Sequence, residues 1–214
     1  MARVKSSATP VYAEVGKKRV FVSARDWPGW CRAGKDEEAA LLALAEYAPR
    51  YAVVANEAGI PFPARVAQHL DVVERVPGDA TTDFGAPAAV AEGDEDPLSP
   101  AEAKRQAALL EAAWAVLDRV VAGAPATLAK GPRGGGRDRD PIVDHVVGAE
   151  AGYARKIGIT RTTPAAALRA EILEAVRTRT FGGPPRSKPW PPRYAIRRIA
   201  WHVLDHAWEI EDKS

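Results

Sequence analysis

Apolar residues in this chain of 214 residues repeat with two different periods, and the period changes near residue 95. Before that point they alternate with polar residues, as in strands that bury one face, over residues 11–15, 19–26 and 70–76. After it they recur every three or four residues, as on one face of a helix. The two periods predict an α+β protein with two domains, which are residues 1–95 and residues 96–214.

The alternating half predicts a small antiparallel sheet with one covering helix. A turn at Gly16 joins the first two strands, and a short third strand is expected over residues 30–33. The covering helix begins at Asp36, whose charge is favoured at a helix N-terminus, and Pro49 is expected to kink or split it. Residues 78–97 have no sustained period and are rich in glycine, proline and acidic residues, so we expect a linker there.

The helical half carries clear start signals for four helices of similar length. Ser99, Pro100 and Glu102 form a capping-box pattern with proline at the first helical position. The other three helices are expected to begin at Asp140-Pro141, Thr163-Pro164 and Pro191-Pro192. Four such helices in succession predict a four-helix bundle.

Charge and cysteine content narrow the class of protein. The formal net charge is +2, so nothing in the composition calls for a nucleic-acid partner, and none is expected. The single cysteine, Cys31, excludes an intrachain disulfide framework and a cysteine-rich zinc site, which favours a reducing compartment. No apolar run approaches the roughly 18 residues of a membrane span, and the opening residues do not resemble a signal peptide. We therefore expect a cytoplasmic protein without a membrane partner.

Three of the four histidines fall where two different helices can direct them at one point. His202 and His206 are four residues apart, which places them on one face of the last helix with β-carbons about 5–6 Å apart. His145 belongs to the second helix of the bundle. All three fall on apolar faces, so we expect them to point into the bundle interior, where neutral imidazoles would bind zinc, nickel, iron or copper. A metal with an open coordination position would activate water or polarise a substrate oxygen or sulfur.

Glu209 is the catalytic candidate beside these histidines. It follows His206 by three residues and so lies on nearly the same helix face. Ligating histidines usually donate their second N–H to an acceptor, so Glu209 is predicted to be that acceptor or a general base. Asp144 and Asp205 are adjacent in sequence to histidines but project from other faces, which makes them weaker candidates.

A structural role for the histidines is the alternative interpretation. Histidine pairs at this spacing also arise by chance, and a partly buried histidine is more often a hydrogen-bonded structural residue than a ligand. Three histidines that face an apolar core are harder to explain without a metal ion, because each would need a polar partner there. On the residues alone, the metal-binding and the structural interpretations therefore both stay open.

The bundle half resembles the DinB/YfiT-like family of four-helix bundles over about residues 98–212. His145 in DHVVGAEAGY matches the histidine of the family's second helix, and His202 and His206 in WHVLDHAWEIED match its final H-x-x-x-H pair. The resemblance implies a divalent metal, zinc or nickel, held by these three histidines with an open coordination side. Characterised members include metal-dependent thiol transferases and a mycothiol-dependent maleylpyruvate isomerase. It therefore also implies a small-molecule substrate, a low-molecular-weight thiol as a further cofactor, and a homodimer.

Two connections of the bundle, residues 130–139 and 181–190, are basic. The first contains a glycine run but lacks the G-K-[S/T] ending and the preceding strand of a P-loop, so a P-loop is rejected. The favoured interpretation is two solvated connections. The alternative is that Arg133, Arg137 and Arg186 guide an anionic substrate or a thiol cofactor toward the metal.

Residues 23–39, which include the run DWPGWCRAG, resemble the HicB-like antitoxin fold. The resemblance implies a ββαβ module with one covering helix, of a kind that binds protein partners elsewhere. Cys31 is interpreted as a packing residue, because no nearby group is placed to activate its thiol. Trp27 and Trp30 are expected to belong to the core of this module.

The sequence leaves functions of different classes open. In the favoured hypothesis the bundle holds a divalent metal and acts on a small molecule as a transferase or hydrolase. In the alternative the N-terminal module docks another protein and the bundle serves as a scaffold or sensor. A bundle with purely structural histidines is the third possibility.

Overall fold

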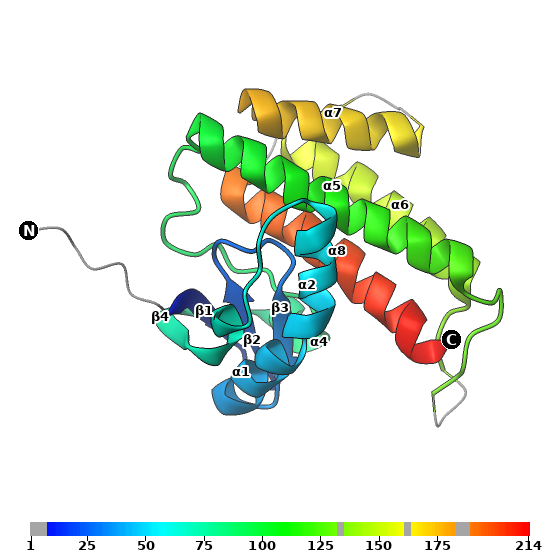
Figure 1. Cartoon of the computed structure of the whole chain (residues 1–214), viewed down its shortest axis with the longest axis horizontal. Coiled ribbons are helices and arrows are strands. Elements are labelled where there is room, and N and C mark those ends of the chain that lie inside the picture. The colour runs from blue at the N-terminus through cyan, green and yellow to red at the C-terminus, as the bar shows by residue number, and fades with distance from the viewer. Residues whose placement is uncertain (1–7, 132–134, 161–163, 183–188) are drawn as a thin grey trace, which may run out of the picture. The chain divides into compact units, whose positions relative to one another are not determined.

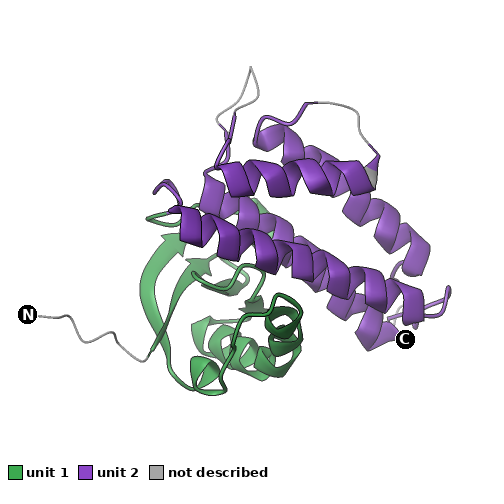
Figure 2. Cartoon of the chain, turned by 45° about the horizontal axis from the view of Figure 1, so that its top comes forward, with its two compact units in different colours: residues 1–93 green, residues 94–214 purple. Residues whose placement is uncertain are grey.

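The computed structural model shows an α+β protein with a four-stranded sheet and eight helices among the residues that it describes. These are residues 8–131, 135–160, 164–182 and 189–214. The chain divides into two compact units, residues 1–93 and 94–214 (Figure 2). Within the described ranges, none of the helices has the length and apolar character that crossing a membrane would require.

The sheet of the first unit is mixed, with the strand order β3-β2-β1-β4 (Figure 1). Its strands are β1 (Thr9–Val15), β2 (Val20–Ala24), β3 (Cys31–Gly34) and β4 (Leu70–Pro77). The first three form antiparallel pairs, but β4 pairs with β1 in parallel. The prediction of an antiparallel sheet is therefore wrong for β4. The helices between β3 and β4 form a crossover, after which β4 runs parallel to β1.

Two helices, rather than one, follow the third strand. In α1 (Glu37–Glu46) the side chain of Asp36 caps the N-terminus by accepting the Ala39 N–H at 2.9 Å. α2 (Ala48–Glu57) has Pro49 in its first turn. The split expected at Pro49 is thus confirmed, and the single covering helix is wrong for the same reason. The short helix α3 (Arg65–Gln68) completes the crossover.

An aromatic cluster fills the core of this unit. Trp30 is fully buried and donates its indole N–H to the Leu44 carbonyl at 2.8 Å, while its ring stacks on Tyr51. Trp27 and Phe62 pack edge-on against the same rings. Cys31 is buried and forms no disulfide. These placements confirm the packing role expected for Trp30 and Cys31, whereas Trp27 contacts the same cluster but is only half-buried.

Most of the segment expected to be a linker belongs to the first unit. It contains α4 (Ala80–Phe84), and its backbone N–H groups at Ala88 and Ala89 donate to the Glu14 carboxylate at 2.9–3.0 Å. Glu14 is fully buried in β1, so these bonds, with one from the Thr82 hydroxyl, satisfy its charge. The segment lacks a period because backbone groups, not an apolar face, attach it to the sheet.

Four long helices make up most of the second unit: α5 (Pro100–Gly123), α6 (Arg139–Lys156), α7 (Ala165–Thr178) and α8 (Pro192–Lys213). α5 packs against α7 and α8, and α6 packs against the same two helices, so the four form a closed bundle (Figure 1). The capping box at the start of α5 is confirmed: Ser99 Oγ accepts the Glu102 N–H at 3.3 Å, and Glu102 accepts the Ser99 N–H at 2.8 Å.

Candidate metal centre

α6 and α8 bring the three histidines named by the sequence together. The Nε2 atoms of His145 and His202 lie 3.2 Å apart. The ring centroids of the three residues are separated by 4.7–5.1 Å, and one ring nitrogen from each lies within 4.8 Å of the others. His206 therefore completes a cluster to which two helices contribute.

This spacing is close to that of a metal-bound set. Imidazole nitrogens that share one zinc ion, each at about 2.0–2.1 Å, lie roughly 3–3.5 Å from one another. The His145–His202 distance falls in that range. The three nitrogens lie within 4.8 Å of one another, and because two nitrogens on one zinc ion are at most about 4.2 Å apart, the widest pair would have to close in by side-chain rotation to bind one ion. Three neutral nitrogen donors without a thiolate fit zinc or nickel.

The cluster opens on one side to solvent, because His202 is buried, His206 is half-buried and His145 is exposed. The expectation that all three side chains point into the interior is wrong for His145. The buried stripe of α6 runs through Ile142 and Val146 at every fourth residue, so His145 lies on the flank of that stripe. An exposed ligand leaves a route by which a small molecule reaches the cluster.

Burial and neighbouring positive charge keep two of the rings neutral. Burial, followed by the charges of His206, Arg198, His145 and Arg137, lowers the pKa of His202 to about 2. The pKa of His145 is also lowered, first by partial burial and then by His206 and Arg137. At neutral pH His145 and His202 therefore each offer a lone pair. The Nδ1 atom of His202 is buried with no hydrogen-bond partner among the described residues.

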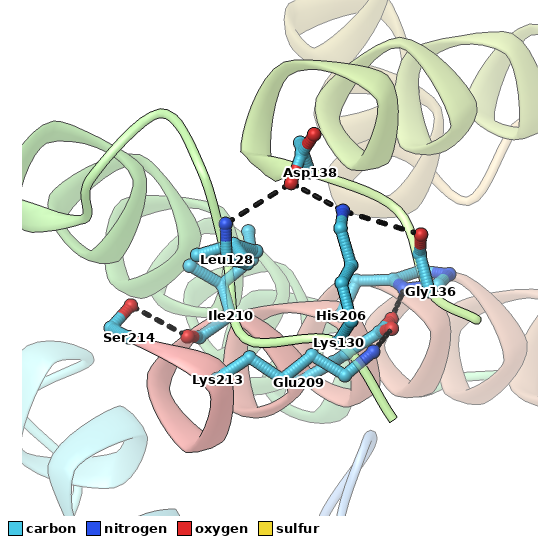
Figure 3. A network of polar contacts seen from close by, with 9 residues as sticks. All are labelled: Leu128, Lys130, Gly136, Asp138, His206, Glu209, Ile210, Lys213 and Ser214. Carbon is cyan, nitrogen blue, oxygen red and sulfur yellow. Dashed lines mark hydrogen bonds and ion pairs between the residues drawn. The ribbon is translucent and has the colours of Figure 1, made fainter. Parts of the chain in front are cut away.

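Glu209 holds the orientation of His206 (Figure 3). The His206 Nδ1 atom lies 2.8 Å from Glu209 Oε2, which leaves His206 Nε2 available for a metal ion. Lys213 donates to the other carboxylate oxygen. The bond from His206 is the largest cause that lowers the pKa of Glu209, which falls to about 2 despite partial burial. A carboxylate already engaged by two donors is suited to orienting His206 rather than to removing a proton from a substrate.

The connection between α5 and α6 is attached to the end of α8. The Ala129 N–H donates to the Lys213 carbonyl at 2.8 Å. Asp138 accepts from the Leu128 N–H at 3.1 Å and from the Lys130 ammonium, as Figure 3 shows. This part of the connection is thus bonded to its surroundings.

Of the three arginines that the sequence analysis named in these connections, the structure describes one. Arg137 is exposed, and its charge acts on His145 and His202. Arg133 and Arg186 lie outside the described residues.

Sequence reasoning did not identify Tyr153 or Arg198 as neighbours of the cluster. The Tyr153 ring of α6 packs edge-on against His202 with centroids 5.5 Å apart, and Trp190 packs on the other side of Tyr153 at 5.1 Å. Arg198 lies over Tyr153 at 5.4 Å. Its position four residues before His202 was the available signal, since that spacing puts both on one helix face.

The fold and the cluster together define a class: an α+β protein with a candidate three-histidine metal centre in its helical unit. No family model, no curated protein and no solved structure matches the chain. The resemblances to the DinB/YfiT-like and HicB-like families therefore stay predictions from short motifs.

Proposed function

We propose that this protein is a divalent-metal-dependent enzyme of the DinB-like type, in which His145, His202 and His206 hold zinc or nickel. The supporting observation is the convergence of three imidazoles from two helices, with one ring nitrogen of each within 4.8 Å of the others. The proposed reaction is transfer or hydrolysis on a small molecule, with a low-molecular-weight thiol as a candidate co-substrate.

The residues of the chain have distinct roles in this proposal. His202 supplies a buried, neutral donor, and His145 supplies the donor at the solvent-exposed side where a substrate enters. Glu209 holds His206 in the tautomer and orientation that a ligand requires. When bound, a divalent metal supplies Lewis acidity, which lowers the pKa of water or polarises a substrate oxygen or sulfur.

Metal analysis of the full chain, purified without a histidine tag, tests the proposal. We expect about one equivalent of zinc or nickel in the wild type and less than about a tenth in His202→Ala. His69→Ala is the matched control, because His69 is exposed in the first unit and lies outside the cluster. Equal metal content in wild type and His202→Ala, or none in either after incubation with zinc or nickel, contradicts the proposal.

A purely structural role for the histidines makes a different prediction. It requires that His202→Ala lowers thermal stability while added zinc leaves the unfolding temperature of the wild type unchanged. A metal that binds only the folded state raises that temperature, and the increase is lost in His202→Ala.

A further inference from the structure

Arg198, a charged side chain beside the cluster, forms no ion pair with a carboxylate among the described residues. It precedes His202 by four residues on α8, and so lies one helical turn away on the same face. Its guanidinium lies over the Trp201 ring at 4.6 Å and over the Tyr153 ring at 5.4 Å. The Tyr153 ring also packs against His202, so it contacts both the guanidinium and the candidate metal centre.

The hydrogen-bonding capacity of Arg198 is not used within the described residues. Its NH1 atom is buried and has no hydrogen-bond partner there. A guanidinium has five N–H donors, and a buried donor without an acceptor costs about 1–3 kcal/mol, more when it is charged. An acceptor from outside the chain would remove this cost.

The other partly or fully buried arginines of α7 and α8 behave differently, because each forms an ion pair with a carboxylate. The pairs are Arg169 with Glu150 and Asp118, Arg193 with Glu102, and Arg197 with Asp94. Arg198 has no such partner among the described residues, although its side chain is also partly buried. In α8, Arg193 and Arg197 each pair with a carboxylate, and Arg198 does not do so within the described part of the chain.

The charge around the cluster also favours an anion. Arg137 and Arg198 both act on His202 as positive charges. The carboxylate bonded to the cluster, Glu209, is shared with Lys213. Three neutral imidazoles add nothing to offset a divalent cation, so a metal would increase the attraction for an anionic ligand.

We propose that Arg198 forms an anion subsite beside the three-histidine cluster and binds the carboxylate or phosphate group of the small-molecule substrate. The inference deepens the proposed function and rests on it, since it names the substrate class of the same centre. The planar guanidinium, which lies against the Trp201 and Tyr153 rings, donates two parallel N–H bonds to one oxyanion. The remainder of the substrate then extends toward His145 and His202.

Anion binding is tested on the full chain, with and without zinc, through the Arg198 side-chain signals in nitrogen-15 NMR. The probes are acetate and inorganic phosphate. Each is titrated separately into metal-free protein, with chloride used to keep the ionic strength constant. Zinc-loaded protein is titrated with acetate only. We expect a saturable shift of the Arg198 signal with at least one probe. Acetate should bind about tenfold more tightly to the zinc-loaded protein, because the metal adds attraction. The probe that binds more tightly identifies the type of oxyanion.

Two variants of Arg198 and one control test whether this side chain binds the anion. In these proteins, probe binding is followed through the backbone amide signals near His202. Arg198→Met should weaken binding of the better probe by at least tenfold. Arg198→Lys should give an intermediate loss, because it keeps the charge and loses the paired N–H groups. Arg177→Met, which removes an exposed ion pair with Glu111, should leave binding unchanged. If Arg198→Met does not fold, as judged by circular dichroism, Arg198→Lys alone decides.

The failure of this inference is distinguishable from the failure of the proposed function. Absence of a saturable shift in the wild type, or equal probe affinity in wild type and Arg198 variants, overturns the anion subsite even when the protein binds zinc. Loss of metal binding with anion binding retained overturns the metal centre instead. Metal content is therefore measured on every sample.

Discussion

At the scale of residues, the hydrogen bond between His206 and Glu209 leads to the most specific prediction about the site. We predict that Glu209→Ala lowers zinc affinity about 10–100-fold, which is the usual effect of removing the partner of a ligating histidine. Glu209→Gln should lose less, since its amide oxygen still accepts the His206 N–H. Competition with a chromogenic chelator measures the affinities.

Glu211→Ala is the control for this series, because Glu211 is exposed on the same helix turn. Its zinc affinity should equal that of the wild type. Equal losses in Glu209→Ala and Glu211→Ala would show that Glu209 acts only through the net charge of the helix end.

The residues of the site differ in how far the sequence revealed them. His202 and His206 were predictable as neighbours because a helix fixes the geometry of residues four apart. The contact of His145 with them depends on the packing of α6 against α8, which no local pattern encodes. The spacing of Arg198 from His202 was a signal that it lies beside the cluster, but the sequence does not show which arginines of α8 pair with a carboxylate.

At the scale of elements, the start of α5 makes stability depend on pH. Bonds from the backbone and side chain of Ser99, and then one from Arg193, lower the pKa of Glu102 from 4.5 to about 2. A carboxyl group whose pKa is lower in the folded state stabilises above its unfolded pKa and loses that stabilisation as the pH falls through the folded pKa. This contribution is therefore complete above about pH 4.5 and is lost toward about pH 2.

We predict that Glu102→Gln makes the free energy of unfolding less dependent on pH in this window than it is in the wild type. The difference should be about 1 kcal/mol, the usual size of a helix cap, because Glu102 is half-exposed and solvent screens its pairing with Arg193. Urea unfolding followed by circular dichroism, at several pH values, measures it. Parallel pH profiles for the two proteins would contradict the assignment.

The elements themselves were predicted unevenly, for physical reasons. Helix starts were readable because capping side chains and prolines act locally. The parallel pairing of β4 with β1 was not readable, since the alternation in residues 70–76 shows a strand with one buried face and not its partner. The attachment of residues 86–93 to Glu14 was missed because backbone N–H groups leave no mark on side-chain patterns.

At the scale of the whole molecule, a buried ion pair indicates where the second unit begins. Arg197 of α8 is paired through two N–H groups with Asp94, and both side chains are buried. Asp94 is the first residue of that unit. The boundary suggested by the change of hydrophobic period, after residue 95, leaves this aspartate on the other side. A pattern of apolar residues does not detect a charge that belongs to the core.

The contribution of Asp94 to the stability of the second unit can be tested with two fragments, one of which begins at Asp94 and the other two residues later. Each is expressed after an initiating methionine. We predict that residues 94–214 fold cooperatively and bind zinc, whereas residues 96–214 are less stable by about 3–5 kcal/mol, because Arg197 is left as an unpaired buried charge. Arg197→Met should therefore destabilise the longer fragment and stabilise the shorter one. Urea unfolding followed by tryptophan fluorescence gives the four free energies. Equal stability of the two unsubstituted fragments would show that Asp94 is dispensable, and the second unit would then begin after it.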